Sequence, residues 1–548
     1  MFAKKCAVIL LLQLTELLFS SAAPELPRFN NSYGWQVALH MPAAESKEVM
    51  VVWYDGESNN TRIDFIGGRV KLFLLGEKGN GVSYKITPVT TEEVLNKNMC
   101  FQVNGTAEDP ITAQDIMPSM EGFEYAGMGA INQHDGEKWR REVRVQERVM
   151  VYTMWVKRDE NNNTIPIEYE MVGINTVTNS HYDHYYIHYD KFLGNEIPEG
   201  TFNVSQFGLK CGPFTGPGNQ IVHNFNPLAE FVAPVRTDHV DSRFEEFVQT
   251  HGKRYESTHE HSLRKDAFRH NLRFIEAHNR KGEGYTLGVN HLADLTNDEL
   301  RVKAPRGRLA SKGYNGGLPF PYDTENVTVP SHIDWRLLGA VTPIKDQMVC
   351  GSCWAFGTNG AMEGAIFIKT GKLISLSEQA LVDCSWGYGN IGCEGGEDFR
   401  AYQWIKKHGG VPANAEYTHY SGENGYCIAE NVTKIGPITG WVNVTSNNEA
   451  ALKLALLKHG PISVAIDASL KTFMFYSSGV YHDKNCRNRD EDLDHAVLAV
   501  GYGTLNGQDY WLVKNSWSPY WGSEGFVLIA RKNNICGVTT AATYPVLA

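Results

Sequence analysis

The sequence predicts an α+β chain of several domains, in which a β-rich N-terminal domain precedes a helical segment and a mixed C-terminal unit. Its 548 residues exceed what a single hydrophobic core usually supports. Apolar and alternating runs bounded by Gly, Asn, Asp and Pro dominate residues 24–230. A helical period follows at 260–279, and a cysteine opens another apolar run at residue 353.

The composition is that of a globular chain, 42% hydrophobic and 21% charged. A formal net charge of -11, without a cluster of Lys and Arg, argues against nucleic-acid binding through a basic surface. After the N-terminal segment no run approaches eighteen apolar residues, so we expect no transmembrane helix.

Residues 1–23 have the pattern of a secretion signal. Lys4 and Lys5 precede an apolar run at 8–19, and small residues follow at 20–23. The alternative is an ordinary amphipathic helix. The signal interpretation predicts entry into the secretory pathway, with the lysosome, a secretory granule or the extracellular space as destination.

Cysteines and sequons agree with that route. Of ten cysteines, Cys6 lies in the signal segment, so an odd number remains and predicts disulfides plus one free thiol. Cys100 and Cys211 are the only cysteines of the β-rich domain, and we expect them to pair. Sequons for N-glycosylation begin at Asn30, Asn59, Asn104, Asn162, Asn203, Asn326, Asn431 and Asn443.

Strand patterns recur through the β-rich domain, residues 24–230. Residues 49–54 are continuously apolar, 144–156 partly alternate, and 165–172 and 182–189 continue the pattern. Because no crossover helix is evident, we expect an antiparallel sheet, a sandwich or a half-barrel. The region resembles the ependymin-related half-barrel proteins, which implies binding of an apolar ligand or of a partner.

Histidines gather in the last of these strands. His184 and His188 could share one face of a strand, while His181 would point the other way. A metal site is the alternative to solvated or packed histidines, which we favour. We expect no metal and no cofactor.

A helical stripe of mixed character marks the next segment. Steps of three and four residues place all its members on one helix face; they are Glu260, Arg264, Phe268, Asn271, Ile275 and Asn279. A surface helix with a coincidental pattern is the alternative. The stripe nevertheless resembles the interrupted motif of propeptides in papain-like cysteine proteases, and residues 288–294 resemble their second motif, with Leu292 where an aromatic residue is usual.

That resemblance implies an inhibitory propeptide domain at 238–300, which crosses the active-site cleft in the direction opposite to substrate. Residues 301–328 are basic and rich in Gly and Pro, so we expect an exposed, cleavable linker. Residues 330–342 resemble the mature N-terminus of the family, which begins a peptidase domain at 329–548.

The catalytic prediction starts at Cys350-Gly-Ser-Cys353-Trp, the local signature of papain and the cathepsins. His495 and Asn515 follow Cys353 about 140 and 160 residues later, each beside a β-branched apolar run. A Cys353 thiolate would attack the peptide carbonyl, and His495 would protonate the leaving amine. Asn515 would orient the imidazole, and Gln347 would donate to the oxyanion.

Two alternatives concern this site. Cys350-x-x-Cys353 could be a redox pair or half of a zinc site, although no second ligand pair follows at a suitable spacing. A catalytically inactive relative acting as a binder is the other. The resemblance to the family implies three disulfides that leave Cys353 free: Cys350–Cys393, Cys384–Cys427 and Cys486–Cys536.

The resemblance is to cathepsin L-like proteases in particular, and it implies a two-lobed fold with a helical lobe and a β-barrel lobe. The substrate-binding residues it implies are Gly395, Gly396, Glu397, Asp398, Ala465, Asp494, Trp517 and Ala541. Glu397 and Asp398 stand where apolar groups usually line the S2 pocket, so S2 is expected to tolerate polar or basic P2 residues unless both acids face solvent.

Three further features of the sequence bear on the prediction. Met348 stands where the family usually has Gly, beside the oxyanion donor. No insertion resembles an occluding loop, which favours endopeptidase activity over dipeptidyl carboxypeptidase activity. The extra N-terminal domain resembles the layout of two-chain insect haemocyte proteases, in which the cleaved N-terminal chain remains bound to the catalytic chain. The expected partners are therefore peptide substrates, its own propeptide and its own N-terminal chain.

Overall fold

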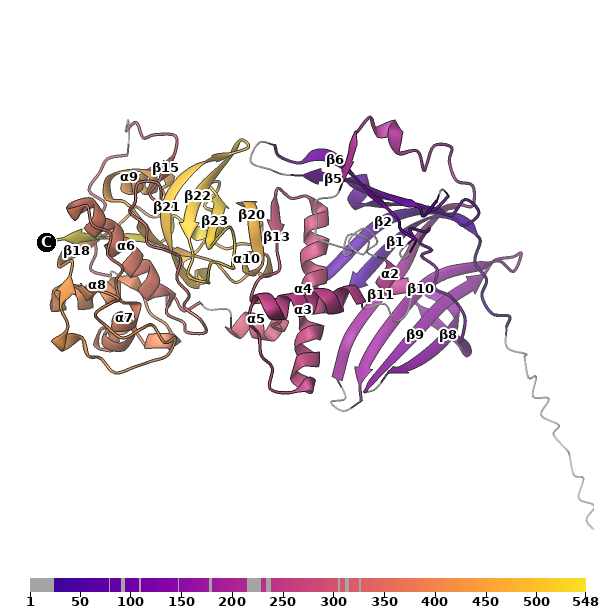
Figure 1. Ribbon diagram of the computed structural model, residues 1–548, viewed down its shortest axis with the longest axis horizontal. Coiled ribbons are helices and arrows are strands. Elements are labelled where there is room, and N and C mark those ends of the chain that lie inside the picture. The colour runs from indigo at the N-terminus through magenta and orange to yellow at the C-terminus, as the bar shows by residue number, and fades with distance from the viewer. Residues whose placement is uncertain are drawn as a thin grey trace, which may run out of the picture.

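The computed structural model describes residues 24–77, 79–89, 94–107, 110–145, 147–176, 180–213, 228–232, 238–303, 306–310, 315–324 and 327–548. The signal segment at 1–23 and the sequon at Asn326 lie outside these ranges. The β-rich domain (called the sheet domain below), the expected propeptide and the expected peptidase domain follow one another along the longest axis (Figure 1). Within the described ranges, no helix is both long and apolar enough to cross a membrane.

The sheet domain is built on one twelve-stranded sheet, ordered β12-β6-β5-β4-β3-β2-β1-β11-β10-β9-β8-β7. Its neighbours are antiparallel except for the short β12 on β6. The strands are β1 Ser32–Met41, β2 Ser46–Asp55, β3 Asn60–Phe65, β4 Val70–Leu75, β5 Val82–Val89, β6 Lys97–Asn104, β7 Glu124–Ile131, β8 His134–Val145, β9 Arg148–Arg158, β10 Thr164–Asn175, β11 Ser180–Gly194 and β12 Cys211–Pro213.

Pairing of β1 with β11 joins the two halves of this sheet, which are distant in sequence. Of the three predicted arrangements, the structure is thus an antiparallel sheet. Residues 144–156 hold the end of β8 and most of β9 rather than one strand. One face carries the core, in which Tyr185 stacks edge-on against Phe231 of α2 (Ala229–Val232) at 4.9 Å between ring centroids.

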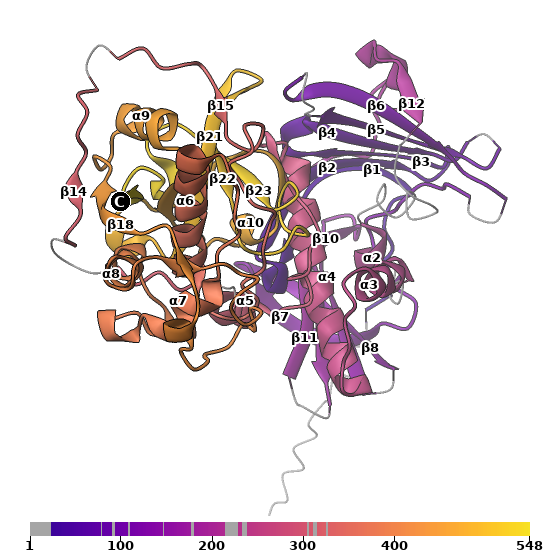
Figure 2. The same ribbon diagram turned by 60° about the vertical axis from the view of Figure 1, so that its left-hand side comes forward.

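The propeptide comprises α3 (Asp238–Thr250), α4 (Thr258–Lys281), the short strand β13 (Tyr285–Leu287) and α5 (Asn297–Lys303). Ser257 caps the start of α4 by accepting a hydrogen bond from the Glu260 N–H, and Gly282 ends it in a left-handed conformation. Helix α4 stands between the sheet domain and the peptidase in Figures 1 and 2.

The mixed stripe on α4 now has a physical explanation, because its polar members fasten the segment that follows the helix. Asn271 donates to the carbonyls of Ala293 and Leu295 at 2.9 and 2.8 Å. Asn279 both donates to and accepts from the Leu287 backbone. Phe268 and Ile275, the apolar members of the same stripe, are buried in the hydrophobic core.

The peptidase has a helical lobe and a β lobe. The first contains α6 (Cys353–Thr370), α7 (Glu378–Cys384) and α8 (Asp398–His408). The second is a ten-stranded sheet, in which β15 (Ile333–Asp334) pairs with β21 and the other strands follow the order β13-β20-β23-β22-β21-β19-β24-β18-β14. Its other strands are β14 Leu318–Pro319, β18 Ile438–Asn443, β19 Ile462–Ile466, β20 Tyr476–Tyr481, β21 His495–Leu505, β22 Gln508–Lys514, β23 Phe526–Ala530 and β24 Ala542–Leu547.

The expected β-barrel is therefore an open sheet. Its two end strands, β13 and β14, are only three and two residues long and precede the peptidase in sequence. Strand β13 pairs antiparallel with β20, so the propeptide adds a strand to the peptidase. The two end strands, β13 and β14, do not pair with each other, so the sheet does not close into a barrel.

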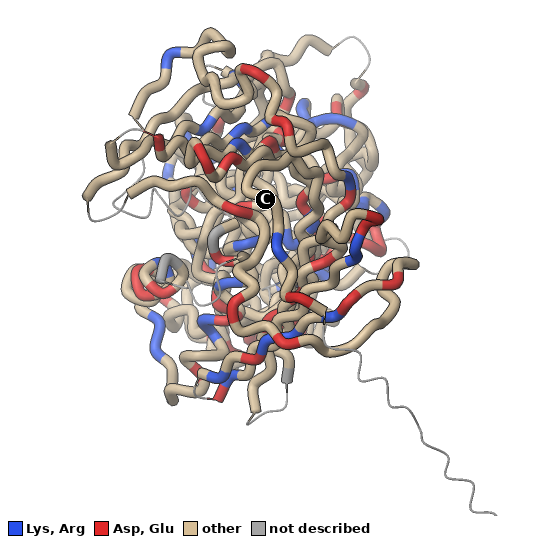
Figure 3. Tube along the Cα trace, turned by 90° about the vertical axis from the view of Figure 1, so that its right-hand side faces the viewer, with Lys and Arg blue, Asp and Glu red and all other residues tan. Residues whose placement is uncertain are grey.

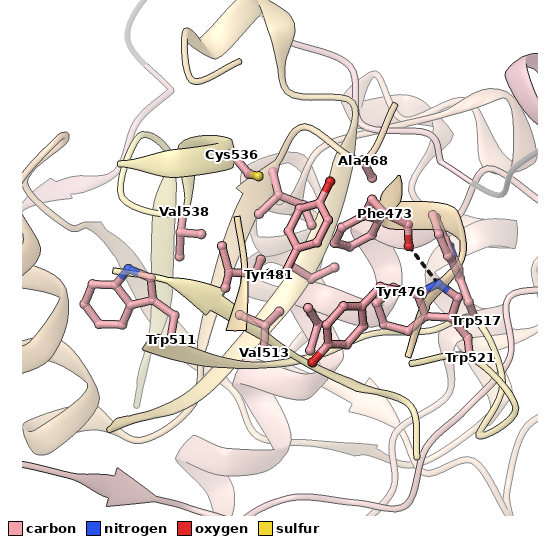
Figure 4. Close-up of a cluster of buried hydrophobic side chains, with 14 of the residues drawn as sticks. Ala468, Phe473, Tyr476, Tyr481, Trp511, Val513, Trp517, Trp521, Cys536 and Val538 are labelled. Carbon is pink, nitrogen blue, oxygen red and sulfur yellow. Dashed lines mark hydrogen bonds between the residues drawn. The ribbon is translucent and has the colours of Figure 1, made fainter. Parts of the chain in front are cut away.

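A core rich in aromatic residues fills the β lobe. Trp511 and Val513 of β22 belong to the same buried cluster as Tyr476 and Tyr481 of β20 (Figure 4). Trp521 donates its indole N–H to the Phe473 carbonyl at 3.2 Å. Acidic and basic residues mix along the chain in Figure 3.

The linker at 301–328, expected to be exposed, is only partly so. Residues 306–309 are half-buried against the peptidase, and β14 lies in parallel pairing with β18. The expectation rested on a composition poor in apolar side chains. The segment is instead held by backbone hydrogen bonds and by arginine side chains, which that reasoning did not consider.

Candidate active site

Cys353 is the first residue of α6, and its side chain is fully buried. The backbone N–H of Ala496 approaches the thiol, which places the sulfur beside the residue that follows His495. A disulfide between Cys350 and Cys393 anchors the turn in front of the helix. The helix N-terminus therefore presents a thiol that the positive end of the helix dipole favours as thiolate.

His495 and Asn515 meet because β21 and β22 are antiparallel neighbours. His495 opens β21 and Asn515 follows β22, and the imidazole Nε2 lies 2.8 Å from Asn515 Oδ1. The amide oxygen must accept, so Nε2 carries the proton. The other ring nitrogen, Nδ1, is buried without a hydrogen-bond partner among the described residues. Trp517 covers the pair, with its ring centroid 4.9 Å from that of His495.

Gln347 is buried and fixed at both ends of its amide. Its Nε2 donates to the Cys350 carbonyl at 2.9 Å, and its Oε1 accepts from the Ser516 hydroxyl at 2.6 Å. These partners assign the amide orientation and leave one N–H of Nε2 for an oxyanion. Met348, at φ 53°, adopts the left-handed conformation that suits Gly, so the turn keeps its path at a backbone cost of about 1–2 kcal/mol.

Burial in this covered site favours neutral side chains. It raises the pKa of the Cys353 thiol to about 12. It lowers the pKa of His495 to about 3; the Asn515 hydrogen bond opposes this shift, and the Arg306 charge adds a smaller lowering effect. In this covered arrangement, desolvation therefore opposes the charged forms of Cys353 and His495.

Residues 306–310 occupy that cleft. The N–H groups of Gly307 and Arg308 donate to the Asp494 carbonyl at 3.1 and 3.0 Å. Gly396 donates to the Gly307 carbonyl at 2.8 Å and accepts from the Leu309 N–H at 3.0 Å. Gly307 permits the approach, because a Cβ there would lie 2.0 Å from the Gly351 carbonyl oxygen. The segment therefore covers the route to Cys353.

A pocket of about 300 Å³ lies beside this segment, and it is the site of the expected S2 residues. Glu397, Asp398, Ala465 and Ala541 all line it. Glu397 approaches Arg400 of its own helix at 3.4 Å, while Asp398 accepts a hydrogen bond from the Thr543 hydroxyl at 2.5 Å. Gly395 lies under the segment, since a Cβ there would meet the Gly307 carbonyl oxygen at 2.9 Å.

Asp494 and Trp517, the remaining residues predicted to bind substrate, lie beside the cleft. Asp494 binds Arg306 at 3.0 Å, and burial raises the pKa of the Asp494 carboxyl while the Arg306 charge opposes that shift. Trp517 is fully buried over His495, so it acts as a cover for the His495–Asn515 bond rather than as a free surface.

The cysteines are joined in the expected pairs. Disulfides link Cys100 to Cys211, Cys350 to Cys393, Cys384 to Cys427 and Cys486 to Cys536. Cys353 is the free cysteine of the described chain. Since Cys350 is oxidised, Cys350-x-x-Cys353 is not a dithiol in this structure.

Sequon exposure divides the predicted glycosylation sites. Asn59 is half-buried and accepts a hydrogen bond from the Ala113 N–H at 2.9 Å, and Asn443 is half-buried and exchanges hydrogen bonds with Asn315. The exposed asparagines are Asn30, Asn104, Asn162, Asn203 and Asn431. Exposure therefore favours glycan attachment at these five positions.

The histidines of β11 lie beside carboxylates rather than in a cluster of ligands. His184 contacts Glu170 at 3.0 Å, and His188 contacts Glu168 at 3.3 Å. Among the described residues no group of three or more His, Cys, Asp or Glu side chains is arranged to hold a metal ion.

Sequence reasoning missed three residues near the cleft: Arg306, Arg308 and Asp490. Arg308 binds Asp490 at 2.6 Å, and Arg306 binds Asp494. Arg306 and Arg308 stand two residues apart around Gly307, so in an extended segment their side chains project to the same side. That spacing was the available signal.

Two family matches cover this part of the chain. Residues 329–546 match the papain family cysteine protease, and residues 244–300 match the cathepsin propeptide inhibitor domain. The digestive cysteine proteinase 1 of Homarus americanus is 44% identical over 312 residues, covering 55% of this chain and 94% of the relative. The cathepsin L-like peptidase of Aedes aegypti is 44% identical over 321 residues, covering 56% of this chain and 94% of the relative.

Solved structures show the same similarity. Digestive procathepsin L 3 from the larval midgut of Tenebrio molitor aligns with a TM-score of 0.51 and 37% identity, covering 56% of this chain and 99% of its own. A recombinant stem bromelain precursor aligns with a TM-score of 0.52 and 37% identity, covering 57% of this chain and 99% of its own. The chain belongs to the papain family of cysteine proteases, with cathepsin L-like relatives and an inhibitory propeptide.

Proposed function

We propose that residues 329–548 form a cysteine endopeptidase in which Cys353 is the nucleophile. The observation that carries this proposal is the His495–Asn515 hydrogen bond at 2.8 Å, beside a free thiol at the start of α6. The bond holds the imidazole with Nδ1 unbonded, so this nitrogen is available to exchange a proton with Cys353.

The reaction proceeds in two halves once the cleft is open. Nδ1 of His495 takes the thiol proton, the Cys353 sulfur bonds to the substrate carbonyl carbon, and the oxyanion receives hydrogen bonds from Gln347 and the Cys353 N–H. The C–N bond then breaks as His495 protonates the leaving amine, which leaves a thioester. Water adds to the thioester carbonyl with His495 as base, and the acid product leaves with restoration of the thiol.

Latency arises from the covered cleft. Residues 306–310 run over Cys353 and hold both sides of the cleft through Gly396 and Asp494. Removal of this segment admits water, which relieves the desolvation that keeps Cys353 and His495 neutral. Cleavage within 301–328 would therefore convert the zymogen into the active enzyme.

The sheet domain would stay attached through the propeptide. Arg273 of α4 binds Asp183 of β11 with two hydrogen bonds, at 2.9 and 3.2 Å, and Glu230 of α2 at 3.0 Å. Arg280 binds Glu48 of β2, and Arg148 of β9 binds Asp266 at 2.9 Å. These contacts support a complex of the N-terminal chain with the catalytic chain that lasts as long as α4 remains bound.

The signal pattern and exposed sequons support a glycoprotein of the secretory pathway, acting in a lysosome, a secretory granule or outside the cell. An acidic compartment suits such an enzyme, because a thiolate paired with a protonated histidine persists at low pH. The four disulfides also favour an oxidising route of synthesis.

Peptidase assays on the acid-activated full-length protein test the proposal. Cys353→Ala should abolish activity, and Gln347→Ala should lower it about 10²–10³-fold through loss of one oxyanion donor. Thermal unfolding of Cys353→Ala should remain close to that of the parent, because no disulfide involves this residue. Peptidase activity that persists in Cys353→Ala would overturn the assignment.

A further inference from the structure

Arg308 presents a basic side chain to the pocket beside the cleft. Its guanidinium donates to the Asp490 carboxylate at 2.6 Å and to the carbonyls of Asp490 and Leu493 at 3.0 and 3.1 Å. Arg308 is 9% exposed at its side chain, whereas Asp490 is 45% exposed. A planar donor thus meets three oxygens at the pocket wall, an arrangement that suits guanidinium better than ammonium.

The backbone around Arg308 defines which substrate position this pocket serves. Gly396 bonds to the residue before Arg308 and to the residue after it, so Arg308 lies opposite Gly396. A substrate that runs in the opposite direction would pair antiparallel with Gly396. The N–H and the carbonyl of one substrate residue would then bond to the carbonyl and the N–H of Gly396. The side chain of that P2 residue would then enter the pocket that Arg308 borders.

Within residues 487–492, Asp490 is the acid that pairs with the propeptide segment and not with the loop's own arginines. Arg487 and Arg489 bind Asp492 at 3.1 and 2.8 Å, and Arg489 also lies 3.4 Å from Glu491. Asp490 instead pairs with Arg308. When the propeptide segment leaves, this carboxylate loses the partner that binds it in the zymogen.

The rest of the pocket accommodates a long polar side chain. Ala465 and Ala541 leave space, and Ser463, Asn443 and Thr543 add polar groups to a wall that also includes Phe399 and Val464. The volume of about 300 Å³ is measured with Arg308 still in place. A long side chain can therefore lie along the apolar wall with its charged end at Asp490.

We propose that Asp490 is a specificity residue that makes this pocket accept arginine at P2, so that the enzyme cleaves peptides with a basic residue at that position. The inference rests on the proposed peptidase activity. It differs from the sequence-based hypothesis in assigning the recognition to Asp490 rather than to Glu397 and Asp398, which bind Arg400 and Thr543.

Two fluorogenic dipeptides that differ only at P2, Arg-Arg and Leu-Arg, test the inference on acid-activated full-length enzyme. Active sites are titrated with a thiol-reactive epoxide, so that differences in activation do not enter kcat/KM. Asp490→Asn should lower kcat/KM for Arg-Arg about three- to tenfold, the range of one partly exposed charged contact, and change Leu-Arg less than about twofold.

Glu491→Gln is the matched control, because it removes one charge from the same loop at a side chain that is 62% exposed. Glu491→Gln should leave kcat/KM unchanged for both substrates. Cleavage of Leu-Arg with no cleavage of Arg-Arg, or an equal effect of Asp490→Asn on both, would overturn the inference while leaving the peptidase assignment intact. Cleavage of neither substrate would instead contradict the proposed function.

Discussion

Arginines bind the propeptide region to its neighbours on two sides, and the two sides differ in burial. Toward the sheet domain, Arg273 and Asp183 are 8% and 5% exposed at their side chains. Toward the peptidase, Arg308 is equally buried but Asp490 is 45% exposed, and Arg306 meets an Asp494 that is 32% exposed. The contact with the sheet domain is therefore shielded from water, whereas the acidic partners in the contact with the peptidase are exposed to it.

This difference predicts unequal strength. Removing one partner of a buried ion pair leaves an uncompensated charge and costs about 3–5 kcal/mol, whereas exposed pairs contribute about 0.2–1 kcal/mol. Burial raises the pKa of Asp183, but Arg273 and His270 outweigh it, so the pKa of this carboxyl lies well below its usual value. Loss of one ion-pair partner is therefore expected to cost more at the sheet-domain contact than at the cleft contact.

The largest expected effect comes from Asp183→Asn in the full-length zymogen. Loss of the carboxylate leaves Arg273 with Glu230 alone in a buried site. Hydrogen exchange of the α4 amides should accelerate on the order of 10²–10³-fold, which corresponds to about 3–4 kcal/mol.

Asp190→Asn on the same strand is the control for that change. Asp190 is 34% exposed and lies 3.5 Å from His188. Its replacement should leave α4 exchange within about threefold of the parent. Equal exchange in the two variants would mean that burial does not distinguish the two kinds of contact.

An intermediate effect is expected from pH at His270. This histidine donates to the Tyr182 carbonyl at 2.9 Å beside Asp183, Arg273 and Arg269, and burial lowers its pKa to about 4. Its folded pKa is below the usual 6.5, so the unfolded segment takes up the proton first as pH falls. The contribution of neutral His270 to the free energy of unfolding is fully present above pH 6.5 and decreases toward pH 4. At pH 4.5 the loss amounts to about 2–3 kcal/mol.

Replacing His270 by Gln isolates this contribution, because the amide can still donate to the carbonyl but does not titrate. Hydrogen exchange of α4, corrected for intrinsic rates, should change less between pH 7 and 4.5 in His270→Gln than in the parent. His181→Gln, at an exposed position on β11, should retain the parental pH dependence. An unaltered pH dependence in His270→Gln would assign the acid response to other groups.

The smallest effect is expected in the cleft. Arg306→Gln removes the contact with Asp494 at 3.0 Å, whose acidic partner already faces water. Residual peptidase activity of the intact zymogen at neutral pH should rise about two- to fivefold, equivalent to about 0.5–1 kcal/mol. Arg301→Gln, at a side chain that is 69% exposed, is the matched control and should not change latency. A hundredfold rise for Arg306→Gln would show that the cleft contact is the stronger one.

Much of the fold could be predicted because its signals are local. The α4 stripe and the Cys353 helix follow from short-range periodicity, and both are present. The pairing of β1 with β11 could not be read from the chain, since the strands alternate similarly and the partners are some 150 residues apart. The ion pair of Arg273 with Asp183 could not be predicted either, because the two residues are 90 positions apart in sequence.

The site divides in the same way. Cys353, His495, Asn515 and Gln347 stand in short motifs, and the structure brings them together. Asp490 was missed because it sits in a loop of alternating acids and bases, where pairing depends on geometry rather than order. The neutral state favoured at Cys353 and His495 depends on residues 306–310, which local motifs do not place in the cleft.

Labelling of Cys353 by a thiol-reactive epoxide, followed by mass spectrometry, provides the most direct test. At neutral pH the intact zymogen should remain unlabelled, because residues 306–310 cover the cleft and burial raises the pKa of the thiol to about 12. After acid activation, one adduct should form at Cys353, with loss of peptidase activity in proportion. Full activity without an adduct at Cys353, or equal labelling of the intact zymogen, would contradict a covered cysteine nucleophile.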